Sequence, residues 1–318
     1  MIIERISSSL VSTYTADIPM TDETVLVPVA AKPTRTVVPT TSQRHLANLL
    51  NTLIERESFP SRIRILDMGC GDVHLLAYLG QVLPTRYPNH SFDFYGFEVG
   101  DIGWHAEGYL EGALDFLREH VPQRGWGDRI SVFSAQDRWP YAPGSFEIII
   151  SNQVLEHVQD HELVFSEIHR CLAPQGVSVH LFPLRETIYE VHAHMPIVHW
   201  IHGVERRGRF MSKFARVGFK RKYFEEIHFR GWTNLGEFGA IYADVLEKMT
   251  NYKTSKQIVD MAERAGLRPD FDYTKNFLLT KLLSLIGRTQ ERYSQPNWID
   301  DATLPLLKRL ASVTLVLH

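Results

Sequence analysis

The sequence predicts an α/β fold with a doubly wound, mostly parallel β-sheet. Between residues 63 and 182, short apolar runs typical of strands alternate with longer runs in which apolar residues recur at helical spacing. This alternation favours a parallel sheet with helices on both faces. In the most informative stretch, an apolar strand ends on Asp67, and a turn that contains Gly69 and Gly71 leads into a helix. Glycines there let the backbone approach a nucleotide-like cofactor at the carboxyl ends of the strands.

The same patterns place the individual elements along the chain. We expect a first helix whose N-cap is Thr41 or Ser42, because apolar residues recur at helical spacing from Leu46 to Ile54. Strands are predicted over 63–67, 92–98, 130–134, 146–151 and 177–182, with helices over 73–86, 107–120 and 161–171. After a long irregular segment, the chain is predicted to continue with a helix over 255–265, a strand over 267–273, helices near 277–286 and 302–310, and a last strand over 312–318.

This pattern divides the chain into four segments. Residues 1–40 are rich in Thr, Val, Ser and Pro and are expected to form either edge strands or an N-terminal arm over the main domain. Residues 41–182 are the predicted cofactor-binding core, and residues 256–318 complete its sheet. Between them, residues 183–255 form an insertion dense in His, Arg and aromatic residues, which we expect to be a helical or irregular lid over the substrate.

Composition limits the partners of the chain. The formal net charge of −3 gives no general attraction to nucleic acid or anionic lipid, although it leaves local basic patches open, and nucleic acid is not an expected partner. The two cysteines, Cys70 and Cys171, are too few for a disulfide framework and lack metal-ligand spacing. No apolar run reaches the length of a membrane span, and the N-terminus does not resemble a signal peptide. These observations predict a soluble, cytoplasmic protein.

The glycine turn argues against a dinucleotide cofactor. A dinucleotide fingerprint reads G-x-G-x-x-G, whereas the three residues after Gly71 contain no glycine and the turn has no Arg or Lys to meet a pyrophosphate. Asp67 instead suits a ligand with a cationic amino group. Glu98 ends the next strand, where an acid hydrogen-bonds ribose hydroxyls in doubly wound folds. Because the third glycine of the fingerprint is missing, a nicotinamide-dependent oxidoreductase is disfavoured.

At this point the residues resemble those of the class I S-adenosylmethionine-dependent methyltransferases, in particular the small-molecule, type 11-like branch. The resemblance covers about residues 62–182, and its motifs occur in order: 66–71 (LDMGCG), 97–99 (FEV), 137–141 (DRWPY) with 145–151 (SFEIIIS), and 154–158 (VLEHV) with 167–176 (EIHRCLAPQG). The chain departs from the pattern at Val73, where many members have a third glycine, and at Gln175, where the first glycine of Pro-Gly-Gly is lost.

The resemblance implies a Rossmann-like sheet of seven strands whose last strand runs antiparallel between the fifth and the sixth. It also implies that S-adenosylmethionine is the cofactor. By this resemblance, Asp67 contacts the amino group, Glu98 the ribose and Val99 the adenine. The other implied contacts are the backbone of Gly69, Cys70 and Gly71 under the methionine portion, Asn152 and Gln153 near it, and Asp137 with Gln136 and Arg138 at the adenine amino group.

The activity implied by the resemblance is in-line methyl transfer to a small or medium acceptor. The large insertion and a similarity to envelope-sugar methyltransferases favour the O-methylation of a sugar, a glycan or a related metabolite. Natural-product and lipid acceptors stay open. So does a different class of function, a cofactor-binding subunit that is not itself catalytic.

His157 is the sharpest candidate for a catalytic base. It follows the fourth strand at the edge of the cofactor site, and the pKa of an imidazole suits proton removal near neutrality. The alternative is that His157 caps the following turn or packs against the cofactor.

The insertion supplies two further catalytic candidates, His192 and His194, which a strand would place on one side. The spacing of Glu190 and the histidines of 190–202 does not match a known zinc-binding motif, so no metal site is expected. A substrate-binding loop and a lid with surface histidines are both compatible with this composition. The basic stretch 206–222 suits a phosphate or anionic lipid, but a solvated helical face is favoured.

Overall fold

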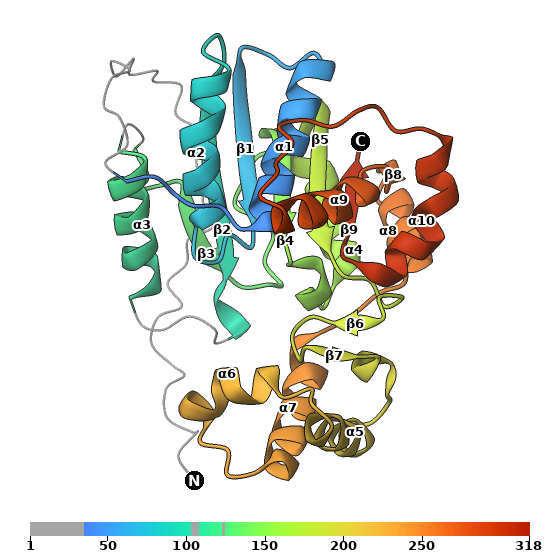
Figure 1. Ribbon diagram of the computed structural model, residues 1–318. Coiled ribbons are helices and arrows are strands. Elements are labelled where there is room, and N and C mark those ends of the chain that lie inside the picture. Colours follow the sequence, from blue (N-terminus) through green and yellow to red (C-terminus); the bar gives the residue numbers. More distant parts are fainter. Residues whose placement is uncertain (1–34, 103–107, 123–124) are drawn as a thin grey trace.

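The computed structural model describes residues 35–102, 108–122 and 125–318, and it has a doubly wound α/β core (Figure 1). The described residues form a seven-stranded sheet in the order β3-β2-β1-β4-β5-β9-β8. The pairs among β1 to β5 are parallel, and β9 is antiparallel to both β5 and β8. The predicted fold class is confirmed, including the antiparallel last strand between the fifth and the sixth. The edge strands or arm expected before residue 35 lie outside the described residues.

The elements of the core have the following bounds. The sheet consists of β1 (Arg62–Met68), β2 (Ser91–Val99), β3 (Ile130–Phe133), β4 (Phe146–Asn152), β5 (Leu172–Phe182), β8 (Pro269–Asp270) and β9 (Val313–Leu317). The core helices are α1 (Thr41–Arg56), α2 (His74–Arg86), α3 (Tyr109–His120), α4 (His161–Cys171), α8 (Ser255–Arg264), α9 (Thr274–Leu285) and α10 (Trp298–Leu310). The short 3₁₀ turns η1 (Gly100–Ile102) and η2 (Leu155–His157) follow β2 and β4.

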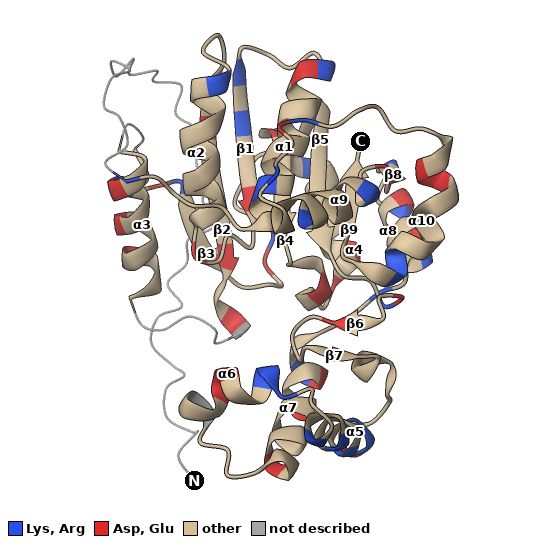
Figure 2. Cartoon of the chain, viewed as in Figure 1, with Lys and Arg blue, Asp and Glu red and all other residues tan. Residues whose placement is uncertain are grey.

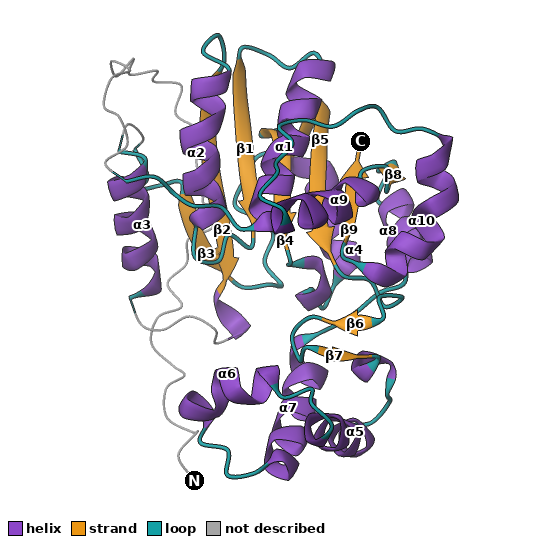
Figure 3. Ribbon diagram, viewed as in Figure 1, coloured by secondary structure: helices purple, strands orange, loops and turns teal. Residues whose placement is uncertain are grey.

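Both faces of the sheet are covered by helices (Figure 3). On β1, Ile63 and Ile65 pack into the core shared with α1, α2, α3 and α9, whereas Leu66 and Met68 pack into the core shared with α4 and α8. This alternation of buried side chains is typical of a strand that is covered on both faces. Within the described residues, no helix is both long enough and apolar enough to cross a membrane.

The structure corrects two details of the predicted elements. The N-cap of α1 is Thr40 rather than Thr41 or Ser42, because Thr40 and Gln43 form a capping box in which each side chain accepts the other's backbone N–H. The strand predicted over 267–273 is reduced to Pro269–Asp270. It ends there because the Asp270 carboxylate accepts the N–H of Asp272 at 3.1 Å and turns the chain.

The insertion is a helical unit with its own core, which is the helical one of the two forms expected for it. It contains the hairpin β6 (Tyr189–Glu190) and β7 (Met195–Pro196), the turn η3 (Val198–Trp200), and helices α5 (Val204–Arg216), α6 (Arg221–Arg230) and α7 (Leu235–Met249). In Figure 1 the hairpin lies between the sheet and these helices. Helices α5 and α7 pack closely because two glycines meet; a Cβ on Gly208 would lie 2.9 Å from the Gly239 carbonyl oxygen.

The insertion leaves and rejoins the core at one place. The N–H of Arg185 donates to the carbonyl of Lys253 at 2.9 Å, so the two connecting segments are hydrogen-bonded neighbours. Basic residues gather on α5 (Figure 2), where Arg206, Arg209, Lys213 and Arg216 are exposed. Their exposure agrees with the solvated helical face that the sequence favoured. Arg207 differs, because it is buried and contacts Glu247 at 2.6 Å.

A buried histidine makes the core sensitive to acid. His180 on β5 is fully buried, and its ring nitrogens lie 2.8 Å from Ser151 Oγ and 2.7 Å from Ser178 Oγ. Burial lowers the pKa of His180 from 6.5 to about 3. The folded protein therefore holds a neutral ring at a pH where the unfolded chain would bind a proton.

We predict that His180 destabilises the fold as the pH falls. Its contribution is intact above pH 6.5 and is lost progressively toward pH 3, at about 1.4 kcal/mol per pH unit. Thermal unfolding over this range should therefore show a steeper fall in Tm for the wild type than for His180→Gln. Equal slopes for the two proteins would contradict the prediction.

Candidate functional site

The glycine turn is fixed to the end of β2 at the carboxyl edge of the sheet. The N–H of Gly71 donates to Oε2 of Glu98 at 2.9 Å, and the other carboxylate oxygen accepts the N–H of Val99 at 3.0 Å. The hydroxyl of Tyr109, at the start of α3, donates to the Gly71 carbonyl. These contacts bring together Gly71, Glu98 and Val99, which the sequence assigned to one site.

Val73 has a backbone conformation that favours glycine. Its φ is +55°, in the left-handed region that a β-branched residue rarely adopts, and Gly69 and Gly71 have φ values of +68° and +50°. The Val73 side chain is fully buried, and its N–H donates to the Cys70 carbonyl at 2.8 Å. Packing and this hydrogen bond therefore hold a strained conformation at the entry to α2.

Asp67 lies one residue before the end of β1, beside the turn, and is buried, with 2% of its surface exposed. Burial, together with the negative charges of Glu98 and Asp72, raises the pKa of Asp67 well above its usual range. A cationic group placed beside this carboxyl group would favour its ionised form. The position therefore suits a ligand that carries an amino group.

The carboxylate of Asp101, which was not among the site residues predicted from the sequence, connects the ends of β2 and β3. Oδ2 of Asp101 accepts the hydroxyl of Ser134 at 2.6 Å and the N–H of Ala135 at 2.7 Å. Asp137 closes the same loop by accepting the N–H of Ser134 at 3.1 Å. Gln136, Asp137 and Arg138 are all exposed on this loop. The signal that could have revealed Asp101 is its place directly after the second strand.

The last residue of β4, Asn152, and the residue after it, Gln153, have different surroundings. Gln153 has a φ of +59°, and its side chain donates to Ser312 Oγ at 3.3 Å, next to β9 and on the side away from β1. Asn152 is half-buried, and its Oδ1 atom is buried without a hydrogen-bond partner among the described residues. A ligand that donates a hydrogen bond there would satisfy it.

A second group of polar side chains lies where η2 meets the hairpin of the insertion. Nδ1 of His157 lies 2.7 Å from the Met249 carbonyl, and Nδ1 of His192 lies 2.7 Å from Oε1 of Glu190. Carbonyl and carboxylate oxygens only accept hydrogen bonds, so both Nδ1 atoms carry hydrogen and the neutral rings have their lone pair on Nε2. The two ring centroids are 4.9 Å apart.

Glu156 faces these imidazoles from within the core. It is 1% exposed, and neither carboxylate oxygen has a hydrogen-bond partner in the described part of the chain. Oε1 of Glu156 lies 4.0 Å from Nε2 of His157. Burial raises the pKa of Glu156 to about 7 and lowers the pKa of His157.

Glu190 supports His192 from the hairpin. Its carboxylate accepts hydrogen bonds from His192, from the hydroxyl of Tyr252 at 2.5 Å and from the N–H of Ala193 at 2.5 Å. Although burial favours the neutral acid, these hydrogen bonds lower the pKa of Glu190 to about 2. Burial of His192 opposes its protonation, but the hydrogen bond and the charge of Glu190 outweigh burial and raise the pKa of His192.

His194 is not part of this group. His192 and His194 lie in the turn between β6 and β7, so the prediction that a strand places both on one side was wrong. His194 has a φ of +53°, and its Nε2 atom lies 3.4 Å from Oε2 of Glu225 on α6. The two imidazoles therefore have different partners, Glu190 for His192 and Glu225 for His194.

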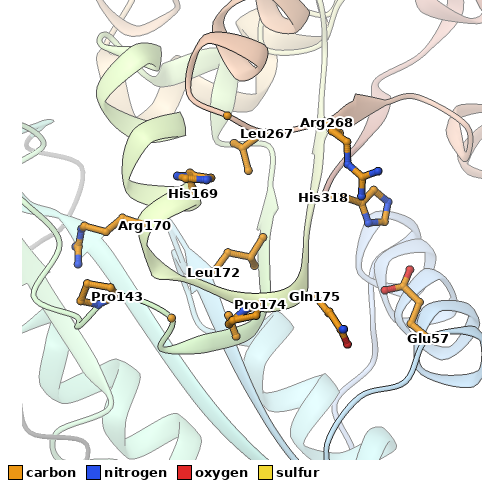
Figure 4. Close-up of a pocket in the computed structure, with 14 residues that line it drawn as sticks. Glu57, Pro143, His169, Arg170, Leu172, Pro174, Gln175, Leu267, Arg268 and His318 are labelled. Carbon is orange, nitrogen blue, oxygen red and sulfur yellow. The ribbon is translucent and has the colours of Figure 1, made fainter.

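Figure 4 shows a pocket at the opposite edge of the sheet. Residues that line it include Pro143, Arg170, Pro174, Gln175, Arg268 and His318. They lie beside the amino ends of β4 and β5, whereas Asp67 and Glu98 lie at the carboxyl ends of their strands. Gln175, where the family pattern is broken, therefore lies away from the glycine turn.

Comparison with known families identifies the class of this chain. Residues 42–270, which are most of the chain, match the family described as a methyltransferase domain. The chain belongs to this family and is a class I S-adenosylmethionine-dependent methyltransferase, with S-adenosylmethionine as its cofactor. A search of curated proteins gave no match.

Solved methyltransferase structures are similar to the chain at low identity. Phosphoethanolamine N-methyltransferase 2 of Haemonchus contortus is 14% identical with a TM-score of 0.40, over 84% of this chain but only 50% of that one. Geranyl diphosphate C-methyltransferase of Streptomyces coelicolor is 14% identical with a TM-score of 0.42, over 87% of this chain and 74% of that one. At these identities and scores, the acceptors of those enzymes say nothing about the acceptor of this chain.

We predict that a side chain at Gly69 disrupts the turn. A Cβ there would lie 2.8 and 2.9 Å from the two methyl groups of Val154, at a φ of +68°. Gly69→Ala should therefore weaken the binding of S-adenosylhomocysteine at least tenfold in calorimetric titration. Gly112→Ala in α3 is the matched control, because a Cβ there meets nothing within 4 Å. The prediction fails if both variants keep the wild-type affinity.

Proposed function

We propose that this methyltransferase methylates a hydroxyl oxygen of a small or medium polar acceptor, with a sugar, a glycan or a related metabolite as the favoured class. One observation carries the proposal. The glycine turn follows β1. Glu156 and His157 follow β4, which is the direct neighbour of β1 in the sheet, and His192 of the insertion lies beside them. Carboxyl ends of parallel neighbours meet at one edge, so a cofactor at the turn would have proton-accepting groups on its acceptor side.

The residues around the turn fit the cofactor. In this proposal Asp67 pairs with its amino group, and the carboxylate of Glu98, which also accepts the N–H groups of Gly71 and Val99, accepts the ribose hydroxyls. The orphaned Oδ1 of Asn152 suits a donor on the methionine portion. The remaining proposed contacts are Gly69, Cys70, Val99, Gln136, Asp137, Arg138 and Gln153.

The bound cofactor supplies a methyl group on a sulfonium, which is reactive by itself. The residues of the chain must therefore align the acceptor oxygen and help to remove its proton. His157 and His192 offer Nε2 lone pairs for this purpose, and Glu190 stabilises positive charge on His192. An acceptor rich in hydroxyls is favoured because imidazoles, carboxylates and the hydroxyl of Tyr252 meet at this place.

The tests below also distinguish this proposal from two other functions. Methylation of a natural product or lipid would point to a less polar acceptor site. Cofactor binding without turnover on any acceptor would favour a non-catalytic partner subunit. A reducing, cytoplasmic compartment is part of the proposal, because Cys70 and Cys171 are both buried and unbridged.

The first prediction for this proposal concerns the two carboxylates. S-adenosylhomocysteine should bind the wild type at micromolar levels, and Asp67→Ala and Glu98→Ala should each weaken binding at least tenfold, because each removes a contact with the ligand. Asp72→Ala is the control from the same turn, since Asp72 is exposed. Calorimetric titration, with NAD in parallel, measures all four proteins. No binding of S-adenosylhomocysteine by the wild type would refute the proposed site.

The second prediction concerns the acceptor's proton. His157→Ala should keep its affinity for S-adenosylhomocysteine but lose about a hundredfold or more in turnover, in the range of general base catalysis. His194→Ala should stay near the wild type, because His194 contacts Glu225 instead. Turnover is measured as product release on a panel of hydroxylated acceptors. Near-normal turnover of His157→Ala would reject its role.

A further inference from the structure

Glu156, His157 and His192 have the arrangement of a metal-ligand set. Each offers one ligand atom, and the three atoms lie within 4.8 Å of one another. Nitrogen and oxygen ligands of one zinc ion, each about 2 Å from the metal, lie roughly 3 to 4 Å apart. Small side-chain rotations would therefore bring the three atoms to ligand distance.

The second layer of contacts also suits metal binding. A histidine ligand almost always donates its other ring N–H to a carboxylate or a backbone carbonyl, which fixes the tautomer and the orientation of the ring. His157 has this contact with the Met249 carbonyl, and His192 has it with Glu190. Tyr252 in turn holds Glu190, with its hydroxyl 2.5 Å from Oε1.

The carboxylate of Glu156 supplies an independent observation. It is 1% exposed, and both of its oxygens are buried without a hydrogen-bond partner in the described chain. Buried polar atoms are rarely left unsatisfied in proteins. A cation next to His157 Nε2, which lies 4.0 Å from Oε1, would satisfy this carboxylate.

We propose that Glu156, His157 and His192 bind a divalent transition-metal ion such as Zn²⁺. Two imidazoles and one carboxylate favour such an ion over Mg²⁺ or Ca²⁺, which prefer oxygen ligands alone. The ion would join η2 of the core to the hairpin of the insertion. Three protein ligands leave a coordination position open.

The open position gives the ion a role in methyl transfer, and this role rests on the proposed function. An acceptor hydroxyl bound to the ion would lose its proton to solvent more readily, and the oxygen would keep the electron pair for the methyl group. In this arrangement the imidazoles act on the acceptor through the ion. Binding of the ion itself does not depend on methyl transfer.

The test uses full-length, tag-free protein stripped of metal and titrated with Co²⁺, whose visible spectrum reports coordination by nitrogen. One Co²⁺ per chain, displaced by Zn²⁺, is expected for the wild type. Glu156→Gln, His157→Asn and His192→Asn should each weaken binding at least tenfold. His194→Asn and Glu225→Gln are matched controls, because they change the other His–Glu pair of the same hairpin region. No Co²⁺ binding by the wild type, or equal binding by the ligand variants and controls, would overturn the proposal.

Two further measurements separate this proposal from the others. Circular dichroism and S-adenosylhomocysteine titration on each variant show that the fold and the cofactor site persist, so loss of Co²⁺ binding in a folded variant supports the metal site. Protein that binds S-adenosylhomocysteine without Co²⁺ refutes only the metal site. Protein that binds Co²⁺ without S-adenosylhomocysteine keeps the metal site and refutes the cofactor assignment.

Discussion

The carboxylate of Glu98 is the contact on which the proposed cofactor site depends. It accepts the N–H of Gly71 and that of Val99, and it thereby holds the turn after β1 against the end of β2. Together with the packing of Val73 and the hydrogen bond from Tyr109 to Gly71, this contact holds a turn that contains three residues of positive φ. The same carboxylate lies beside the buried Asp67 and contributes to its raised pKa. One side chain thus shapes the turn and sets part of its charge.

The acceptor side is assembled differently, from two separately built units. The core supplies Glu156 and His157 on η2, directly after a strand whose position is fixed by the sheet. The insertion supplies His192 from a tight hairpin, and Glu190 and Tyr252 hold that imidazole in place. Precise placement of reacting groups requires such support from neighbouring residues. The chemistry proposed here therefore depends on the insertion being seated on the core.

The sequence was a good guide wherever local pattern decides structure. The sheet follows from short apolar runs, and helix 161–171 was predicted with its observed bounds. The local sequence pattern did not predict the features that tertiary contacts determine. Gly208 and Gly239 allow α5 and α7 to approach, a contact that no local pattern predicted. The meeting of Glu156 with His192 was invisible, because 35 residues separate them. The different partners of His192 and His194 depend on the geometry of the turn between β6 and β7, which the composition does not encode.

The hydrogen bond between Arg185 and Lys253 has a consequence for how such an enzyme can diversify. Because the two connecting segments are adjacent, everything between them could be exchanged for a short loop or another module while the seven strands keep their register. If the insertion forms the acceptor side as proposed, its replacement would alter acceptor choice without disturbing methyl-donor binding. Evolution or a protein engineer could vary one specificity while the other stays constant.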